Sequence, residues 1–494
     1  MKSRKEMNPE FMWDFSHIFP SREAFEASFA ECEKKIEELA GFRGHLGDSP
    51  EKLAGSLDTL FGVTEKVERV LSYASLHKEA DNSDPEYQEL DARATGLYVK
   101  YNAATSYISP EIIGIGAEKL EAWLGSTPAL GTYAFMIRDL IRMQDHVLDP
   151  AREQMLAELG DASRAPNDCY DMLTNVDMEF PAVKMTDGTE SQLTNGNFGV
   201  YRENTDREVR RDAFEKFFGT YKKYINTFAA TYGGSVKYDC FNAKVRGYSS
   251  ACEAALFDGN VPVSVYDSLV SAIHDALPSM RRYLDIRRKA MGVDKIDMFD
   301  LYVPIVDGVD IPMSYSDAKT LVKEALKPFG KRYGELLDRA YSEHWIDVYE
   351  NKGKSSGAFS AGVYGVHPYV MLNYTDTLDD AFTLAHELGH AMHSFFSSET
   401  QDYANHDYRI MVAEVASTVN EVMLTKFLLA HESDPGRRAY ILNHFLEGFR
   451  TTVFRQTLFA EFERRSHDMY AAGTPLTAKS LSDVYYDLIS TYYE

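Results

Sequence analysis

The string His386-Glu387-Leu388-Gly389-His390 constrains the fold of this chain more than any other stretch of its sequence. Two histidines four residues apart lie on one face only if the segment is a helix. On such a helix both imidazoles can bind one Zn²⁺ ion, and Glu387 can reach a water molecule on that metal. The flanking residues are largely apolar, so we expect the helix to be buried. The alternative is a pair of hydrogen-bonded core histidines.

A hydrolytic zinc site needs a third protein ligand and keeps its fourth position open for water. A third histidine six residues after His390 would mark a metzincin, but position 396 is Phe. The downstream carboxylates are Glu399, Glu414 and Glu421. Glu399 follows the helix too closely to fold back. Glu414 lies in an apolar helical stretch, where a buried carboxylate needs a reason, and we therefore predict Glu414 as the third ligand.

Two further polar residues are candidates for supporting the metal ligands. Glu421 falls two turns beyond Glu414 on the same helix face, so it could accept a hydrogen bond from a ligand imidazole or be a solvated surface charge. His393 lies three residues past His390 and near the same face. We expect His393 to make a hydrogen bond behind the ligands rather than a bond to the metal.

Helical periodicity dominates the chain and predicts a mainly α fold. Residues 20–150 show a succession of amphipathic helices, and the pattern changes at 180–197, where a small hairpin is predicted. Helices resume from about 205 to 291. Two more non-helical segments follow, at 298–312 and at 347–374.

The last non-helical segment leads into the histidine helix and contains two candidate strands, 357–362 and 369–374. A sheet edge beside a metal cleft can pair with an extended peptide, so Gly357, Ala358 and Phe359 are candidate substrate-binding residues. The alternative is that the glycines only make turns. His367 is a candidate for lining the cleft or for an ordinary loop role. A capping box at Thr377 predicts where the histidine helix begins.

Charge and composition limit the partners and the compartment. The chain carries a formal net charge of −24, which argues against nucleic acid and anionic membranes as partners. No run approaches the length of a membrane span, and no apolar segment follows the N-terminal residues. Four cysteines lack metal or pairing spacing and indicate a reducing compartment. We therefore predict a cytoplasmic enzyme without membrane or nucleic-acid partners; its oligomeric state stays open.

Several motifs together resemble oligoendopeptidase F, of the thimet-oligopeptidase-like zinc metallopeptidases. The resemblance is strong around the histidine helix and weaker in the first 200 residues. The motifs that carry it are Gly353-Lys354, Gly357-Ala358-Phe359, Asn373-Tyr374, the run from Thr383 to His390, the run from Ala413 to Thr418, Arg246-Gly247-Tyr248 and the run from Phe454 to Glu463.

The resemblance implies a two-lobed helical metallopeptidase with a small sheet beside the zinc helix and a deep central channel for short peptides. The family's metal ligands map onto His386, His390 and Glu414, with one zinc ion, and its general base maps onto Glu387. The chain divides by sequence into an N-terminal helical region (1–112), a helical region ending in a hairpin (113–199) and a catalytic region (200–494).

The last helix carries an apolar stripe to Glu494 without a stop signal, so we expect a C-terminally truncated chain. Family members continue with a helical segment whose His and Tyr residues line the cleft. The sequence thus predicts a zinc endopeptidase for short oligopeptides and leaves two alternatives. One is a catalytically silent scaffold that binds peptide or metal, and the other is a dipeptidyl carboxypeptidase.

Overall fold

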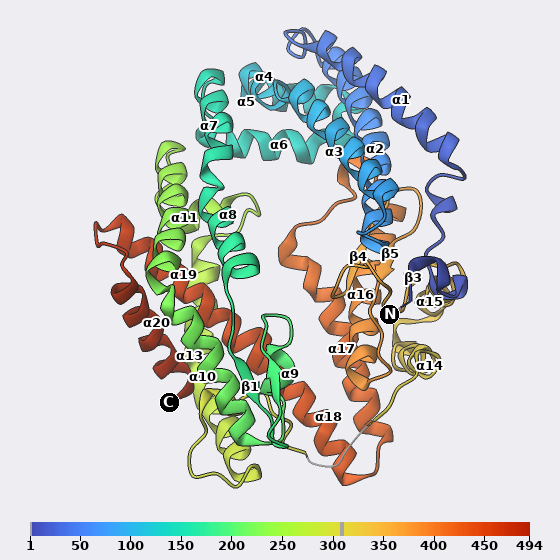
Figure 1. The fold of residues 1–494 in the computed structure, drawn as a ribbon. Helices are drawn as coiled ribbons and strands as arrows, with labels where there is room; N and C mark the ends of the chain where they lie inside the picture. Colours follow the sequence, from blue (N-terminus) through green and yellow to red (C-terminus); the bar gives the residue numbers. More distant parts are fainter. Residues whose placement is uncertain (1, 307–310) are drawn as a thin grey trace. The chain divides into compact units, whose positions relative to one another are not determined.

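Helices make up 72% of the chain, and the strands of the described residues form two small sheets. The structure, a computed structural model, describes residues 2–306 and 311–494, and Figure 1 colours it from the N-terminus to the C-terminus. The predicted mainly α fold is confirmed. In the described residues, no helix has both the length and the apolar character that crossing a membrane requires.

Contacts between residues divide the chain into two compact units, each made of two separate segments. Unit 1 combines Met1–Gln144 with Asp310–Glu432, and unit 2 combines Asp145–Val309 with Ser433–Glu494. Every candidate site residue predicted from the sequence belongs to unit 1. The deep channel and the sequence boundaries at 112 and 199 stay predictions.

The first segment of unit 1 is a series of helices whose starts are marked by capping side chains. The Ser49 hydroxyl accepts from the backbone N–H of Lys52, and a proline follows the cap. Asp84 caps the next helix in the same way, again before a proline. A capping side chain and a proline in the first turn both favour a helix start. The helices are α1 (Arg22–Leu39), α2 (Pro50–Ala80), α3 (Pro85–Thr105), α4 (Ile108–Ile115), α5 (Ala117–Ser126) and α6 (Ala134–Met143).

A three-stranded sheet in unit 1 has the order β3-β5-β4. Its strands are β3 (Ile346–Asp347), β4 (Phe359–Ala361) and β5 (Tyr369–Met371), with β5 parallel to β3 and antiparallel to β4. The central strand β5 is fully buried, whereas β4 forms an edge. The Trp13 indole N–H donates to the carbonyls of Trp345 (3.1 Å) and Val370 (2.9 Å), which ties the N-terminal segment to the sheet. The two strands predicted in this region are confirmed.

A buried cluster of charges joins the start of the chain to β3. Arg4 Nη1 donates to Asp347 Oδ1 (2.9 Å) and to Asn351 Oδ1 (3.1 Å), and Arg4 Nη2 pairs with the other Asp347 oxygen. Lys354 Nζ lies 2.8 Å from the same carboxylate. Burial alone would raise the pKa of Asp347, but hydrogen bonds and charges from Arg4 and Lys354 outweigh it and hold that pKa below its ordinary value. The buried carboxylate therefore stays charged between two cations.

The helices α16 (Leu378–Thr400) and α17 (Ile410–His431) lie side by side (Figure 1). Their backbones are in close contact at Gly389. A Cβ atom at position 389 would lie 2.6 Å from Ser417 Cα and 2.7 Å from the Ala416 carbonyl oxygen. These are backbone atoms and cannot give way as a flexible side chain can. Only glycine therefore permits this spacing between the two helices.

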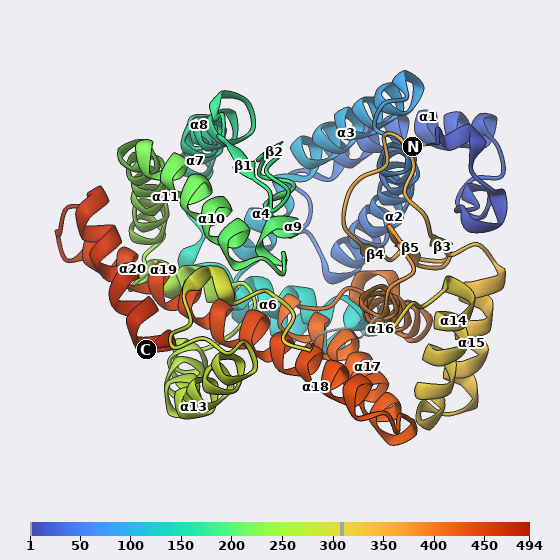
Figure 2. The ribbon, with the colours of Figure 1, turned by 60° about the horizontal axis from the view of Figure 1, so that its bottom comes forward.

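Neighbouring elements hold α16 in place. The helix starts at the predicted capping box, in which the Thr377 hydroxyl accepts from the Asp380 N–H. Helix α14 (Tyr315–Ala325) packs against both α16 and α17, and α15 (Lys331–Ser342) contacts α16 (Figure 2). Strands β4 and β5 also contact α16, so the predicted sheet beside the histidine helix is confirmed.

Unit 2 is built from helices and a two-stranded hairpin. In the hairpin, β1 (Ala182–Lys184) pairs antiparallel with β2 (Glu190–Gln192), as predicted for 180–197. The helices are α7 (Pro150–Ser163), α8 (Ala165–Met172), α9 (Phe198–Arg202), α10 (Arg207–Lys223), α11 (Ile225–Val245), α12 (Ala251–Phe257), α13 (Val263–Ala290), α18 (Pro435–Gly448), α19 (Arg455–Ala471) and α20 (Ala478–Tyr493).

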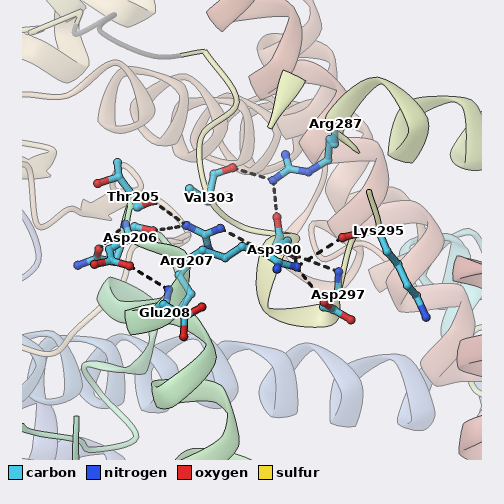
Figure 3. A network of polar contacts seen from close by, with 11 residues as sticks. Thr205, Asp206, Arg207, Glu208, Arg287, Lys295, Asp297, Asp300 and Val303 are labelled. Carbon is cyan, nitrogen blue, oxygen red and sulfur yellow. Dashed lines mark hydrogen bonds and ion pairs between the residues drawn. The ribbon is translucent and has the colours of Figure 1, made fainter. Parts of the chain in front are cut away.

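Asp300 organises the interior of unit 2 beside α10 and α13 (Figure 3). Its fully buried carboxylate lies 2.7 Å from Arg207 Nη2 and 2.9 Å from Arg210 Nη2. Arg287 Nη2 donates to the carbonyl oxygens of Asp300 (2.9 Å) and Val303 (2.7 Å). The loop after α13 is thus fixed by arginines from two helices, and the buried Asp300 carboxylate pairs with the buried Arg210 and the half-buried Arg207.

Gly389→Ala should separate α16 from α17 because the added methyl group meets backbone atoms. We expect the free energy of unfolding of unit 1 to fall by about 1–3 kcal/mol, as for other overpacked sites. Urea unfolding monitored by tryptophan fluorescence measures this free energy. All three tryptophans of the chain, Trp13, Trp123 and Trp345, belong to unit 1. Gly96→Ala in α3, where nothing lies within 4 Å of the added atom, is the control and should stabilise slightly. Equal midpoints for the two variants would contradict the argument.

Asp347→Asn should leave Arg4 and Lys354 buried without their carboxylate and lower the free energy of unfolding of unit 1 by about 3–5 kcal/mol. Because the pKa of Asp347 is lowered in the folded state, its ion pairs should make unit 1 less stable as the pH falls. The contribution of Asp347 to the free energy of unfolding is fully present above its pKa in the unfolded chain, about 3.9. It is lost as the pH falls through its pKa in the folded protein. Tryptophan-detected urea midpoints between neutral and acid pH should therefore drop in the parent protein, while the variant loses that part of the pH dependence. If the urea midpoint of the variant fell at acid pH as much as that of the parent, this role of Asp347 would be disproved.

Candidate active site

Three side-chain atoms from α16 and α17 converge on one point. His386 Nε2 lies 3.2 Å from His390 Nε2, and Glu414 Oε2 lies 3.4 Å and 3.5 Å from those two nitrogens. Among the described residues, these three form the one group of His, Cys, Asp or Glu side chains whose ligand atoms could hold a metal ion. The structure thus brings together the three residues that the sequence predicted as ligands.

The donor set fits zinc. Tetrahedral zinc with imidazole and carboxylate ligands places its donor atoms roughly 3.3 Å apart, close to the spacing of these three atoms. Two neutral imidazoles and one carboxylate are also a donor set that zinc takes in hydrolytic sites, where three protein ligands leave one position open.

Glu421 orients the first histidine. Its Oε1 accepts a hydrogen bond from His386 Nδ1, which leaves the His386 Nε2 lone pair facing the other two donors. Burial acts to lower the pKa of His386, but the hydrogen bond and charge of Glu421 outweigh it and raise that pKa. Of the two interpretations open from sequence, the supporting hydrogen bond is the one present.

Two side chains that sequence reasoning missed complete the frame of the site. The Ser417 hydroxyl donates to Glu414 Oε2 (2.8 Å), and the Asn420 amide donates across the helix pair to the Ala385 carbonyl oxygen (2.9 Å). The Tyr333 hydroxyl in turn donates to Asn420 Oδ1 (3.0 Å). The position of Ser417, one turn after Glu414, was a usable signal, whereas the Asn420 contact depends on how the two helices pack.

Glu387 lies beside the converging donors and is only 6% exposed. Burial raises the pKa of Glu387 to about 7; His386 opposes this shift, while the carboxylates of Glu414 and Glu421 add to it. Its Oε2 atom is buried without a hydrogen-bond partner in the described structure. A carboxyl group with a raised pKa and a free oxygen is suited to taking up and returning a proton.

Glu414 itself differs from the expectation of a buried carboxylate. Its side chain is 61% exposed, and apolar neighbours on α17 such as Met411 and Val415 are also exposed. The apolar character of this stretch was therefore wrong as a sign of burial. The buried residues of α17, among them Ser417 and Asn420, lie on the side that contacts α16. Glu399, excluded as a ligand from sequence, pairs with Arg332 at the end of α16.

His393 is not part of the converging group. Its ring stacks on Tyr408 with centroids 3.8 Å apart and planes 15° from parallel. The structure shows no hydrogen bond from His393 to a ligand side chain, so the expected hydrogen bond behind the ligands is absent from the described residues.

The candidate substrate residues lie on and before the edge strand. Phe359 pairs with Met371, and β4 has no second neighbour among the described strands. Gly357 has a φ of 85°, and both its carbonyl and that of Ser355 accept from the Asn373 amide at 2.9 Å. Gly357 therefore makes a turn, while Ala358 and Phe359 lead into a strand with a free edge.

His367 lies apart from the metal donors. It is 6% exposed, stacks on Trp345 and shares a 2.8 Å hydrogen bond between its Nε2 and His17 Nδ1. Burial lowers its pKa to about 4, so the ring is neutral. It lines a hollow beside the second half of α16 that does not include the three donor residues. A role for His367 in substrate binding stays a prediction.

Comparison with known proteins identifies the family. The family described as "Peptidase family M3" matches residues 200–494, and "Oligopeptidase F" matches residues 111–180. Oligopeptidase PepF of Bacillus subtilis is 40% identical over 493 residues, which cover 100% of this chain and 74% of that protein.

Two crystal structures are similar over nearly the whole chain. Oligoendopeptidase-F from Enterococcus faecium is 34% identical with a TM-score of 0.72 and covers 96% of this chain and 80% of its own. A peptidase from Chlamydophila abortus is 30% identical with a TM-score of 0.90, covering 100% and 83%. The resemblance seen in the motifs is confirmed. This chain belongs to peptidase family M3.

Proposed function

We propose that this chain is a zinc-dependent endopeptidase that hydrolyses internal bonds of short oligopeptides. The observation that carries the proposal is the convergence of His386 Nε2, His390 Nε2 and Glu414 Oε2 within 3.5 Å, beside the buried Glu387. The relatives named as oligopeptidases support the substrate class.

The side chains of the site have separate roles. His386, His390 and Glu414 would hold one zinc ion, with Glu421 orienting the His386 imidazole and Ser417 holding the Glu414 carboxylate. When bound, zinc supplies a Lewis acid and lowers the pKa of a coordinated water to about 7. Glu387 takes the proton of the attacking water and later delivers it to the leaving amine. Its buried position keeps competing water from that proton.

The edge strand β4 offers a place for the substrate backbone. Its free N–H and C=O groups can pair with an extended peptide, and neighbouring contacts with α16 keep the strand next to the helix that carries both histidines. Gly357, Ala358 and Phe359 would then lie along the bound peptide. The turn at Gly357 is held by Asn373, so the start of the strand is rigid.

The cytoplasm is the proposed compartment. All four cysteines are free, and Cys32 is buried with its pKa raised to about 11, mainly by burial. Such thiols suit a reducing environment.

Blocked-peptide hydrolysis tests the function. A short quenched fluorescent peptide with both termini blocked should be cleaved by the full chain loaded with zinc. Chelation should abolish cleavage, and added zinc should restore it. Glu387→Gln should lower kcat by about 10²–10⁴-fold without loss of zinc, because the variant keeps the ligands and removes the base.

The same assay separates the alternatives. Cleavage only of peptides with a free C-terminus would identify a dipeptidyl carboxypeptidase. Zinc binding without any cleavage would identify a catalytically silent scaffold. Cleavage that survives both chelation and Glu387→Gln would disprove the mechanism.

Glu421→Gln tests the support of the first ligand. An amide oxygen accepts more weakly than a carboxylate, so the zinc Kd should rise about 10–100-fold. Chelator competition measures this Kd, and tryptophan-detected unfolding checks that unit 1 is intact. Glu335→Gln removes an exposed carboxylate paired with Lys331 on the same unit and should leave the Kd unchanged. Equal Kd values for both variants would show that Glu421 does not support the ligand.

A further inference from the structure

His393 is a polar residue in the site region that the mechanism leaves without a role. It lies on α16 three residues after His390 and seven after His386, so all three imidazoles project from one helix face. Its ring stacks on Tyr408, whose hydroxyl hydrogen-bonds with the Ser394 hydroxyl at 2.9 Å. The next residue, Arg409, is tied to Asp139 at 2.7 Å. The ring is therefore held in one orientation from outside its own helix.

The two ring nitrogens of His393 have different surroundings. Nδ1 is buried and has no hydrogen-bond partner in the described part of the chain. Nε2 also makes no hydrogen bond there, yet it is not among the buried unpaired atoms, so it reaches solvent. A buried N–H without an acceptor is rarely tolerated, which places the hydrogen of the neutral ring on Nε2. Burial also lowers the pKa of His393, in keeping with a neutral ring.

Stacking alone does not account for a histidine at this position. Phenylalanine would stack on Tyr408 equally well. It would also avoid the free-energy cost of a buried nitrogen without a hydrogen-bond partner, which proteins rarely tolerate. The second ring nitrogen, Nε2, accounts for the histidine, because its N–H group can donate to a group that is not part of the chain. That group is not the metal, since His393 stands outside the three-residue cluster.

The partner of His393 must be a hydrogen-bond acceptor, because the neutral ring presents an uncharged Nε2–H donor. A backbone carbonyl meets the requirement and is present in every peptide, whatever its side chains.

We propose that His393 binds a backbone carbonyl of the substrate peptide, next to the bond that is cleaved, through its Nε2–H group. This inference rests on the proposed peptidase function. His393 is then a substrate-binding residue on the same helix face as the two histidine ligands. The stacked Tyr408 ring holds its imidazole in the orientation needed for this hydrogen bond.

His393→Phe is the primary test because it keeps the stacking ring and removes the donor. For the blocked peptide we expect KM to rise about tenfold with kcat within about twofold of the parent, as for one lost hydrogen bond made equally in the ground state and the transition state. Zinc content and the tryptophan-detected urea midpoint should be unchanged. His393→Gln restores an N–H donor and should recover most of the lost affinity.

His431→Phe is the matched control. His431 also lies against an aromatic ring, that of Phe427, but at the exposed end of α17, so the same substitution there should leave KM unchanged. A parental KM for His393→Phe, or a loss of zinc or stability that accounts for its defect, would overturn the inference. If Glu387→Gln still abolishes cleavage in that case, the proposed function stands and only the role of His393 fails.

Discussion

The close contact between α16 and α17 at Gly389 is the constraint on which the metal donors depend. At this point the backbone of one helix lies where a side chain of the other would be, because a Cβ on Gly389 would be only 2.6 Å from Ser417 Cα. The donor atoms of His386 and His390 come from one helix and that of Glu414 from the other. Their separations of 3.2–3.5 Å leave little tolerance for a shift of either helix.

The parts of the site that the sequence predicts well are those that depend on residues close together in the chain. His386 and His390 need only the helical period, and the capping box at Thr377 needs only four consecutive residues. The strands before α16 could be predicted for the same reason, since short apolar runs between glycines and prolines are local signals. Glu414 was chosen over Glu399 and Glu421 because its stretch of chain is apolar, and this criterion selected a residue of the converging group although its side chain is exposed.

What sequence could not predict depends on packing between distant segments. The apolar stretch around Glu414 suggested burial, but which face of α17 is covered is decided by Gly389, Ser417 and Asn420 at the helix contact. The stack of His393 on Tyr408 arises because the connection between the helices folds back on α16. The hydrogen bond that His386 donates to Glu421 likewise depends on how the two helices are aligned, so the spacing along one helix suggests it without deciding it.

The pairing of Arg4 with Asp347 has a consequence for how the chain is made. The two residues are 343 positions apart, and the first segment of unit 2 is synthesised between them. At about 5–20 residues per second, roughly 20–70 s separate the appearance of the two partners on the ribosome. During that interval the N-terminal helices exist as a nascent fragment without the sheet that covers their core. Unit 1 therefore closes late, and the helices that carry the metal donors are the last of its parts to be translated.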